Sequence, residues 1–145
     1  MTTPADLATA AVDIAATPER VWAALTDPDQ IAVWMYGTRV ATSWQVGSPI
    51  TWSGSYDGHT FVDRGEVLIV DPPRVLSMTH YSPLMGTEDR PENYHTLVCT
   101  LTPHDASTSL SLTQDGCVDA AQVELFSANW QQMLHGLRSH VEADQ

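Results

Sequence analysis

Residues 119–141, DAAQVELFSANWQQMLHGLRSHV, carry apolar side chains at steps of three and four residues. That spacing predicts one apolar stripe along an α-helix. Asp119 is placed to cap the helix, with Gln122 three residues further on. A helix of roughly 22 residues is about 33 Å long at ~1.5 Å per residue, which is enough to cross a whole domain. The stripe consists of Val123, Phe126, Trp130, Leu134, Leu137 and Val141.

The chain before this helix has a dominant period of two, which is typical of β-strands. A first strand is expected over residues 7–15, followed by two short helices. Thr17 before Pro18, and Asp27 before Pro28, are the cap-and-proline signals that begin these helices, and Gly37 ends the second. Turn residues separate the later segments. Six further strands are expected at residues 38–44, 49–55, 60–71, 75–81, 94–102 and 107–115.

Short connections between consecutive strands predict an antiparallel meander. One curved sheet packed around one long helix is the economical way to bury both apolar faces. The sequence therefore predicts an α+β fold with about seven antiparallel strands wrapped around the C-terminal helix. A length of 145 residues favours a single domain over residues 1–145.

The charge balance excludes several classes of function. Eighteen acidic and six basic residues give a net charge of -12, and every basic residue is an arginine. Without lysine there is no Schiff-base chemistry and no phosphate-binding P-loop. The negative charge disfavours nucleic acid and anionic membranes as partners.

The sequence also predicts a cytoplasmic protein. Residues 1–6 have neither a basic start nor an apolar run, so no signal peptide is expected. No stretch approaches the ~18 apolar residues of a membrane span. Cys99 and Cys117 are too few for a disulfide framework, which favours a reducing compartment.

Several strings resemble the START-like (SRPBCC) superfamily and, within it, the family named for the activator of heat-shock-protein-90 ATPase. The resemblance covers about residues 7–142 and implies a helix-grip fold with a hollow between sheet and helix. The superfamily includes lipid carriers, hormone receptors, polyketide cyclases and co-chaperones, so several roles stay open. The strings are TPERVWAALTDP at 17–28, GEV at 65–67, DPPRVL at 71–76, SLSLTQ at 109–114 and NW at 129–130. HYSPL at 80–84 and PENYHT at 91–96 are similar to a bacterial subgroup.

Strand parity predicts which side chains line that hollow. Pairing Leu76 with Cys99 and Met78 with Leu97 sets His80 opposite His95. Pairing Leu101 with Leu110 sets Gln114 opposite Leu97. Such a face is mostly apolar, with three polar side chains toward one end, which is the usual form of a small-molecule site. The expected ligand-binding residues are Trp34, Trp52, Met78, His80, His95, Leu97, Cys99, Gln114 and Trp130.

Each of these signals also has an ordinary structural interpretation. His80 and His95 are candidates to bind a ligand or to act as acid and base, or else they are a cross-strand pair satisfied by water or backbone. Cys99 lies about 13 Å along the strand from His95 at ~3.3 Å per residue, so no metal site is expected. Cys99 is expected to be a small core residue, and Trp34 and Trp130 are candidates for either ligand stacking or core packing. The connection over residues 82–92 is the candidate functional loop, as a lid, a partner contact or a solvated connection.

Three functions remain open from the sequence. The first is binding of an apolar or aromatic small molecule between sheet and helix, with no cofactor and no catalytic residue. The second is a protein-interaction module that acts on a chaperone ATPase, as the family resemblance implies. The third is a cyclase or dehydratase with His80 or His95 as its base. The oligomeric state is left open.

Overall fold

A computed structural model describes residues 6–143 of the chain. Residues 1–5, where no signal peptide is predicted, and residues 144–145 lie outside this part. One seven-stranded sheet, entirely antiparallel, has the order β1-β7-β6-β5-β4-β3-β2. The strands are β1 (Ala8–Ile14), β2 (Arg39–Ala41), β3 (Pro49–Tyr56), β4 (His59–Asp71), β5 (Val75–His80), β6 (His95–His104) and β7 (Ser107–Gln114).

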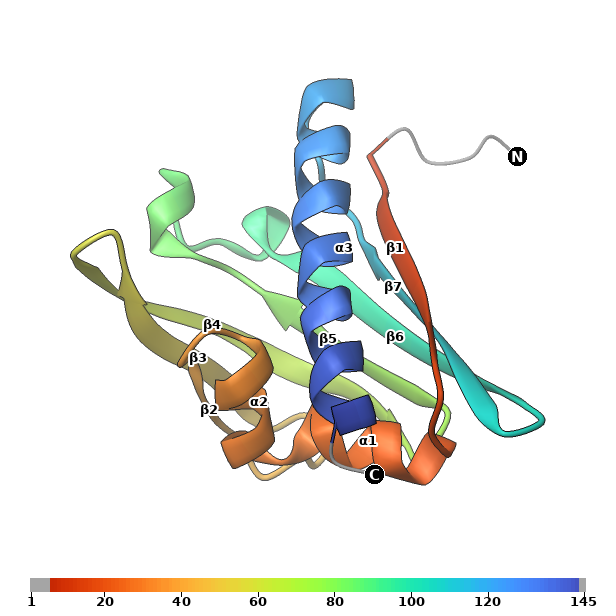
Figure 1. The fold of residues 1–145 in the computed structure, drawn as a ribbon. Coiled ribbons are helices and arrows are strands. Elements are labelled where there is room, and N and C mark those ends of the chain that lie inside the picture. Colours follow the sequence, from red (N-terminus) through yellow and green to blue (C-terminus); the bar gives the residue numbers. More distant parts are fainter. Residues whose placement is uncertain (1–5, 144–145) are drawn as a thin grey trace.

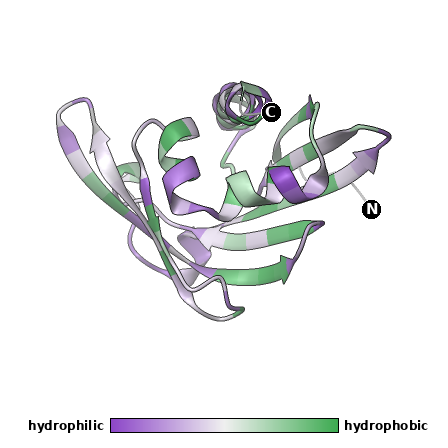
Figure 2. Cartoon of the chain, turned by 60° about the horizontal axis from the view of Figure 1, so that its bottom comes forward, coloured by the Kyte–Doolittle hydropathy of each residue, from purple (hydrophilic) through white to green (hydrophobic). Residues whose placement is uncertain are grey.

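The helices lie on one side of this sheet. The short helices α1 (Pro18–Thr26) and α2 (Pro28–Trp34) follow β1, and the long helix α3 (Ala120–Ala143) ends the described chain. Figure 1 shows α3 crossing in front of the sheet, with α1 and α2 near its C-terminal end. Figure 2 shows the sheet curved into a trough, with α3 seen end-on above it. The predicted α+β helix-grip architecture is therefore confirmed.

The predicted helix signals form hydrogen bonds at each helix start. Thr17 Oγ1 accepts from the N–H of Arg20 at 3.2 Å, and Asp27 Oδ1 accepts from the N–H of Asp29 at 3.0 Å. Asp119 Oδ1 likewise accepts from the N–H of Gln122 at 2.8 Å. These bonds satisfy backbone donors that have no partner within the first turn of a helix.

The predicted register of the central strands is confirmed. Leu76 pairs with Cys99 and His80 with His95 between β5 and β6. Leu97 pairs with Gln114 between β6 and β7. Alternation of apolar and polar residues was sufficient here, because a slip by one residue would expose every leucine of the concave face.

The strand predicted over residues 38–44 is too long. Only the three residues of β2 pair with β3. Trp44 has a φ of 60°, in the left-handed region that strands do not use, and its N–H bonds to Thr42 Oγ1 at 3.3 Å. The chain therefore turns after Ala41. The connection between β5 and β6, which includes the candidate loop over residues 82–92, contains two short 3₁₀ turns, Pro83–Met85 and Pro91–Asn93.

Helix α3 is fastened to the edge of the sheet at β1. Gln131 bonds the backbone of Ala11 twice, with Oε1 accepting from the N–H at 3.1 Å and Nε2 donating to the carbonyl at 2.7 Å. Ser127 Oγ accepts from the N–H of Thr9 at 3.0 Å. Polar side chains of the helix thereby satisfy an edge that would otherwise be open to pairing with another chain.

The apolar stripe of α3 is buried along only half its length. Leu134, Leu137 and Val141 are fully buried in the core, whereas Phe126 and Trp130 are only partly covered. The C-terminal half of the helix therefore packs against the sheet and α1, and its N-terminal half stands over less densely filled space.

Replacement of Gln131 by alanine is expected to lower the free energy of unfolding by about 1–2 kcal/mol, because both bonds to Ala11 are lost. The matched control is Gln132→Ala, at the exposed neighbouring position on the same helix, which should stay within about 0.5 kcal/mol of wild type. Urea unfolding of the two variants measures the difference. Equal stabilities would show that these bonds do not hold α3 on the sheet.

Candidate functional site

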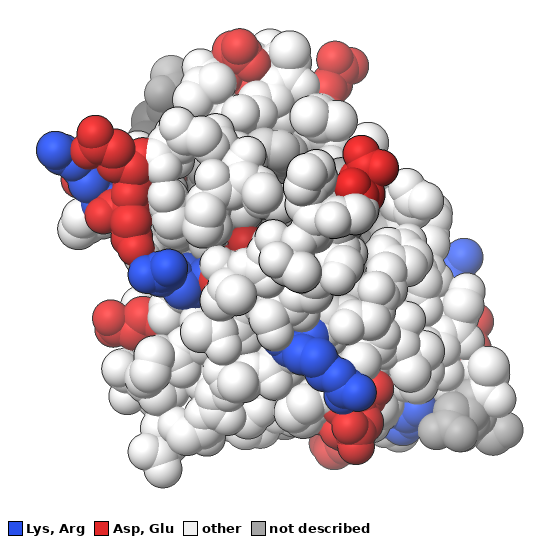
Figure 3. All heavy atoms as spheres, turned by 90° about the vertical axis from the view of Figure 1, so that its left-hand side faces the viewer, with Lys and Arg blue, Asp and Glu red and all other residues white. Residues whose placement is uncertain are grey.

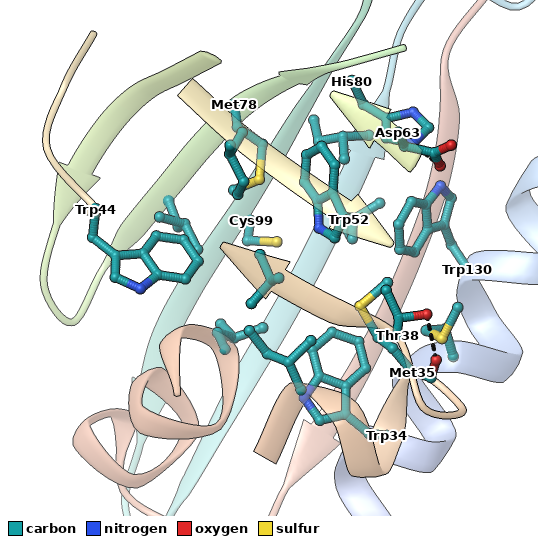
Figure 4. Close-up of a pocket in the computed structure, with 18 of the residues that line it drawn as sticks. Trp34, Met35, Thr38, Trp44, Trp52, Asp63, Met78, His80, Cys99 and Trp130 are labelled. Atoms are coloured by element: carbon teal, nitrogen blue, oxygen red, sulfur yellow. Dashed lines mark hydrogen bonds and ion pairs between the residues drawn. The ribbon is translucent and has the colours of Figure 1, made fainter. Parts of the chain in front are cut away.

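A cavity of about 230 Å³ lies between the concave face of the sheet and the helices. Its floor comes from β5, β6 and β7, and its walls come from α2, β2–β4 and α3 (Figure 4). The lining is almost entirely apolar, and Asp63 and His80 are its only ionisable side chains apart from the Cys99 thiol. The cavity is lined by Leu25, Ile31, Trp34, Met35, Thr38, Val40, Trp44, Ile50, Trp52, Phe61, Asp63, Leu76, Met78, His80, Leu97, Cys99, Leu112, Trp130 and Met133.

The structure divides the predicted site residues between two neighbouring cavities. The larger one contains Trp34, Trp52, Met78, His80, Leu97, Cys99 and Trp130. His95 and Gln114 line a second cavity of about 180 Å³. His80, Trp130 and Met133 belong to both linings, so they form the boundary between the two spaces.

The indole of Trp130 is held at this boundary by Gln114. Its Nε1–H donates to Gln114 Oε1 at 2.6 Å. Gln114 is itself buried at the end of β7. A buried amide that fixes an aromatic ring gives the partition between the two cavities a defined position.

His80 and His95 lie opposite each other in the sheet, but their side chains have different partners. His95 Nδ1 lies 2.8 Å from the carbonyl oxygen of Asp115, and its ring meets Phe126 edge-on at 6.2 Å between centroids. His80 Nε2 lies 2.8 Å from Asp63 Oδ2. The two rings therefore have separate partners: His95 is tied to backbone, as its ordinary structural interpretation expected, while His80 belongs to a pair with a carboxylate.

Asp63 is the functional candidate that the sequence analysis missed. It stands opposite Trp52 in the β3–β4 hairpin, so both side chains face the cavity. The hairpin turns through Asp57 and Gly58, whose φ values are 51° and 78°. A two-residue turn of this type fixes the register of its strands. Counting outward from Asp-Gly places residue 63 opposite residue 52, and this signal could have found Asp63.

Close contact between β4 and β5 brings Asp63 to His80. A Cβ at Gly65 would come within 1.8 Å of the carbonyl oxygen of Thr79, so only glycine allows this approach. Next to it, Arg64 and Tyr81 exchange backbone hydrogen bonds of 3.0 and 2.8 Å. The Trp52 ring packs against His80 with 5.1 Å between centroids and 67° between planes. Strand geometry on both sides therefore fixes the Asp63–His80 pair (Figure 4).

Cys99 is a cavity-floor residue with an unreactive thiol. Burial raises its pKa from the usual 9.0 to about 12. Its cross-strand neighbours are Leu76 and Leu112. Burial also raises the pKa of the Cys117 thiol. Both cysteines are free and buried.

No group of three or more His, Cys, Asp or Glu side chains within residues 6–143 is arranged to hold a metal ion. None of the helices in this part of the chain is long and apolar enough to cross a membrane.

The family model for activator of Hsp90 ATPase homolog 1-like proteins matches residues 15–142. The chain belongs to this family. A comparison with curated proteins gave no match.

Solved structures of similar fold span nearly the whole chain. The solution structure of ChR145 from Cytophaga hutchinsonii is 35% identical with a TM-score of 0.85, and the match covers 99% of this chain and 98% of that one. DynU16, from the dynemicin biosynthetic locus, is 22% identical with a TM-score of 0.80 over 98% of this chain and 49% of that one. The Aha1 dimer from Colwellia psychrerythraea is 19% identical with a TM-score of 0.73 over 94% and 96%. The last two likenesses concern the fold alone.

The buried Cys99 thiol is expected to react with a disulfide reagent roughly a thousandfold more slowly than an ordinary thiol at pH 8, because a pKa near 12 leaves that much less thiolate than the usual 9.0. The rate should keep rising with pH up to pH 10, since the thiolate fraction is still increasing there. A Cys117→Ala background isolates the signal, and unfolding in urea should restore ordinary reactivity. Rapid labelling of the folded protein would contradict the assignment of Cys99 to a closed, apolar cavity floor.

Proposed function

We propose that this protein binds an apolar or aromatic small molecule in the cavity between the sheet and α3, and that it does so in the cytoplasm. The observation that carries the proposal is a cavity of about 230 Å³ with an almost wholly apolar lining. Apolar enclosed spaces with few polar groups are the usual form of small-molecule sites. An apolar space of this size filled by neither ligand nor water would cost about 5.5 kcal/mol at ~24 cal/mol per Å³, which is a large share of the stability of a typical domain.

The cavity volume sets the size of the proposed ligand. An apolar cavity of about 150 Å³ in another protein holds one benzene ring. The volume of about 230 Å³ here suits a fused two-ring aromatic. Four tryptophans line it, Trp34, Trp44, Trp52 and Trp130, and their faces offer stacking and edge-on contacts to such a ring.

Naphthalene is therefore expected to bind the wild-type chain, and Cys99→Phe is expected to abolish binding because the new ring fills the cavity from its floor. At ten times its dissociation constant, naphthalene should raise the free energy of unfolding by about 1.4 kcal/mol. The measurement is thermal unfolding with and without naphthalene, supported by amide shifts mapped onto β5–β7 and α3.

The matched control is Val98→Phe, which adds the same ring one residue earlier on β6, on the opposite face of the sheet. This variant should bind naphthalene as wild type does. No stabilisation of wild type by naphthalene, or equal loss of binding in both variants, would overturn the proposed cavity site.

A protein-interaction role is the second candidate, and family membership favours it. Figure 3 shows a face on which uncharged side chains predominate, with arginine and acidic residues scattered among them and along one edge. Interface cores contain few charged residues, so such a face suits contact with another protein. If stimulation of a chaperone ATPase is the main role, it acts from the exterior and is unaffected by Cys99→Phe.

A cyclase or dehydratase role is the third candidate, and the His80–Asp63 pair favours it. A carboxylate that orients an imidazole is a common arrangement for a general base. This role requires pH-dependent turnover of a polyketide-like substrate that His80→Ala abolishes. His95 is the weaker candidate base, because its ring is oriented by the neutral Asp115 carbonyl and not by a carboxylate.

A further inference from the structure

Asp63, a residue of the cavity lining, has one carboxylate oxygen without a hydrogen-bond partner. Its Oδ2 is bonded to His80 Nε2 at 2.8 Å. Its Oδ1 is buried and has no hydrogen-bond partner, and it is the only such side-chain nitrogen or oxygen among the described side chains. The Asp63 side chain is 14% exposed, so solvent reaches little of it. Buried polar atoms in folded proteins are nearly always paired with protein, with water or with a bound group, so Oδ1 is available to accept one hydrogen bond.

The chemistry of this acceptor restricts the bound group. A carboxylate oxygen accepts hydrogen bonds and has no proton to donate. The partner of Oδ1 must therefore be a donor, an O–H or an N–H. Hydrogen bonds to charged groups are stronger than those between neutral groups, so the match matters for affinity.

The surrounding charges exclude anionic ligands. The cavity lining contains no lysine or arginine, and Asp63 is its only acidic side chain. The whole chain carries a net charge of -12. A carboxylate or sulfonate would be removed from water with no cationic partner and beside a like charge, which is costly in an apolar site.

We infer that Asp63 Oδ1 is the polar anchor of the ligand site, and that the site selects neutral or cationic aromatic molecules with an O–H or N–H donor. This inference rests on the proposed function, because it specifies the ligand class of the same cavity. His80 fixes the carboxylate by its bond to Oδ2, and Trp52 packs against the His80 ring. His80 is thus a positioning residue for the anchor.

The test compares indole with benzofuran. These two-ring molecules have nearly the same shape, but indole has an N–H where benzofuran has an ether oxygen. Indole is expected to bind wild type about tenfold more tightly, the effect of one hydrogen bond to a charged group. In Asp63→Asn the amide oxygen would accept the hydrogen bond from His80, and the NH₂ group would take the place of Oδ1. The ratio of the benzofuran dissociation constant to the indole dissociation constant should then fall to about one, mainly because indole binds less tightly.

The matched control is Asp57→Asn. Asp57 is exposed at the turn of the same hairpin, so this variant removes the same charge far from the cavity. Asparagine also readily adopts the left-handed conformation of that turn. Asp57→Asn should keep the wild-type preference for indole. Calorimetric titration of each protein with each molecule gives the ratios.

The outcomes separate this inference from the proposed function. Equal binding of indole and benzofuran to wild type overturns the anchor and leaves the cavity site intact. This comparison uses only the wild-type chain, so it decides the matter even if Asp63→Asn does not fold. An unchanged preference in Asp63→Asn also overturns the anchor. Failure of indole, benzofuran and naphthalene alike to bind overturns both the anchor and the proposed function.

Discussion

The attachment of α3 to the edge strand β1 is the constraint on which the cavity depends. Ser127, Gln131 and Glu142 bond backbone N–H groups of the β1 edge and of Ala15 just beyond it, at 2.9 to 3.1 Å. A helix packed over the middle of the sheet would fill the trough with its own side chains. The backbone of α3 instead lies closest to the edge strand β1 and to α1 and α2, and over the cavity it reaches the sheet only through side chains such as Trp130 and Met133. Space remains above β5 and β6.

The opposite wall has a separate origin. The long strand β4 has an irregular register with β5 between Val67 and Ile69, which bends the sheet. Gly65 lets β4 come closer to Thr79 than any other residue would allow. The β3–β4 hairpin brings Trp52 and Asp63 to the same cavity. The cavity is thus a product of two constraints, one at each side of the sheet.

The sequence predicted the structure best where a single pattern determined the positions of the residues. Alternation fixed the register of β5, β6 and β7, because the leucines leave only one face that can be buried. It failed at Trp44, where a left-handed residue ends the pattern without a glycine to signal it. The Asp57-Gly58 turn is enough to place Asp63 opposite Trp52, but its contact with His80 also depends on the close approach of β4 to β5 at Gly65. Counting from either one alone does not bring its carboxylate to His80.

The same distinction applies to the two histidines. Parity placed His80 opposite His95 correctly, yet opposite positions in a sheet do not decide which hydrogen-bond partner each side chain has. The rotamer of each ring follows its best hydrogen-bond partner, the Asp63 carboxylate for His80 and the Asp115 carbonyl for His95. Neither partner is a cross-strand neighbour within the β5–β6 pair. Polar side chains near a cavity are therefore less predictable than the apolar floor that carries them.

If the proposed ligand site exists, the partition at Trp130 limits the size of a ligand that fits without rearrangement. The cavities of about 230 and 180 Å³ meet at its indole, which is bonded to Gln114 at 2.6 Å. A molecule larger than two fused rings must extend from one space into the other. It then has to move the indole and break that bond, which leaves a buried amide oxygen without its donor. A larger ligand can recover this cost only if it carries a second donor for Gln114. The side chains on the boundary thus link the size of a ligand to its polarity. A small ligand needs one hydrogen-bond donor, for Asp63, while a longer ligand needs a second donor for Gln114.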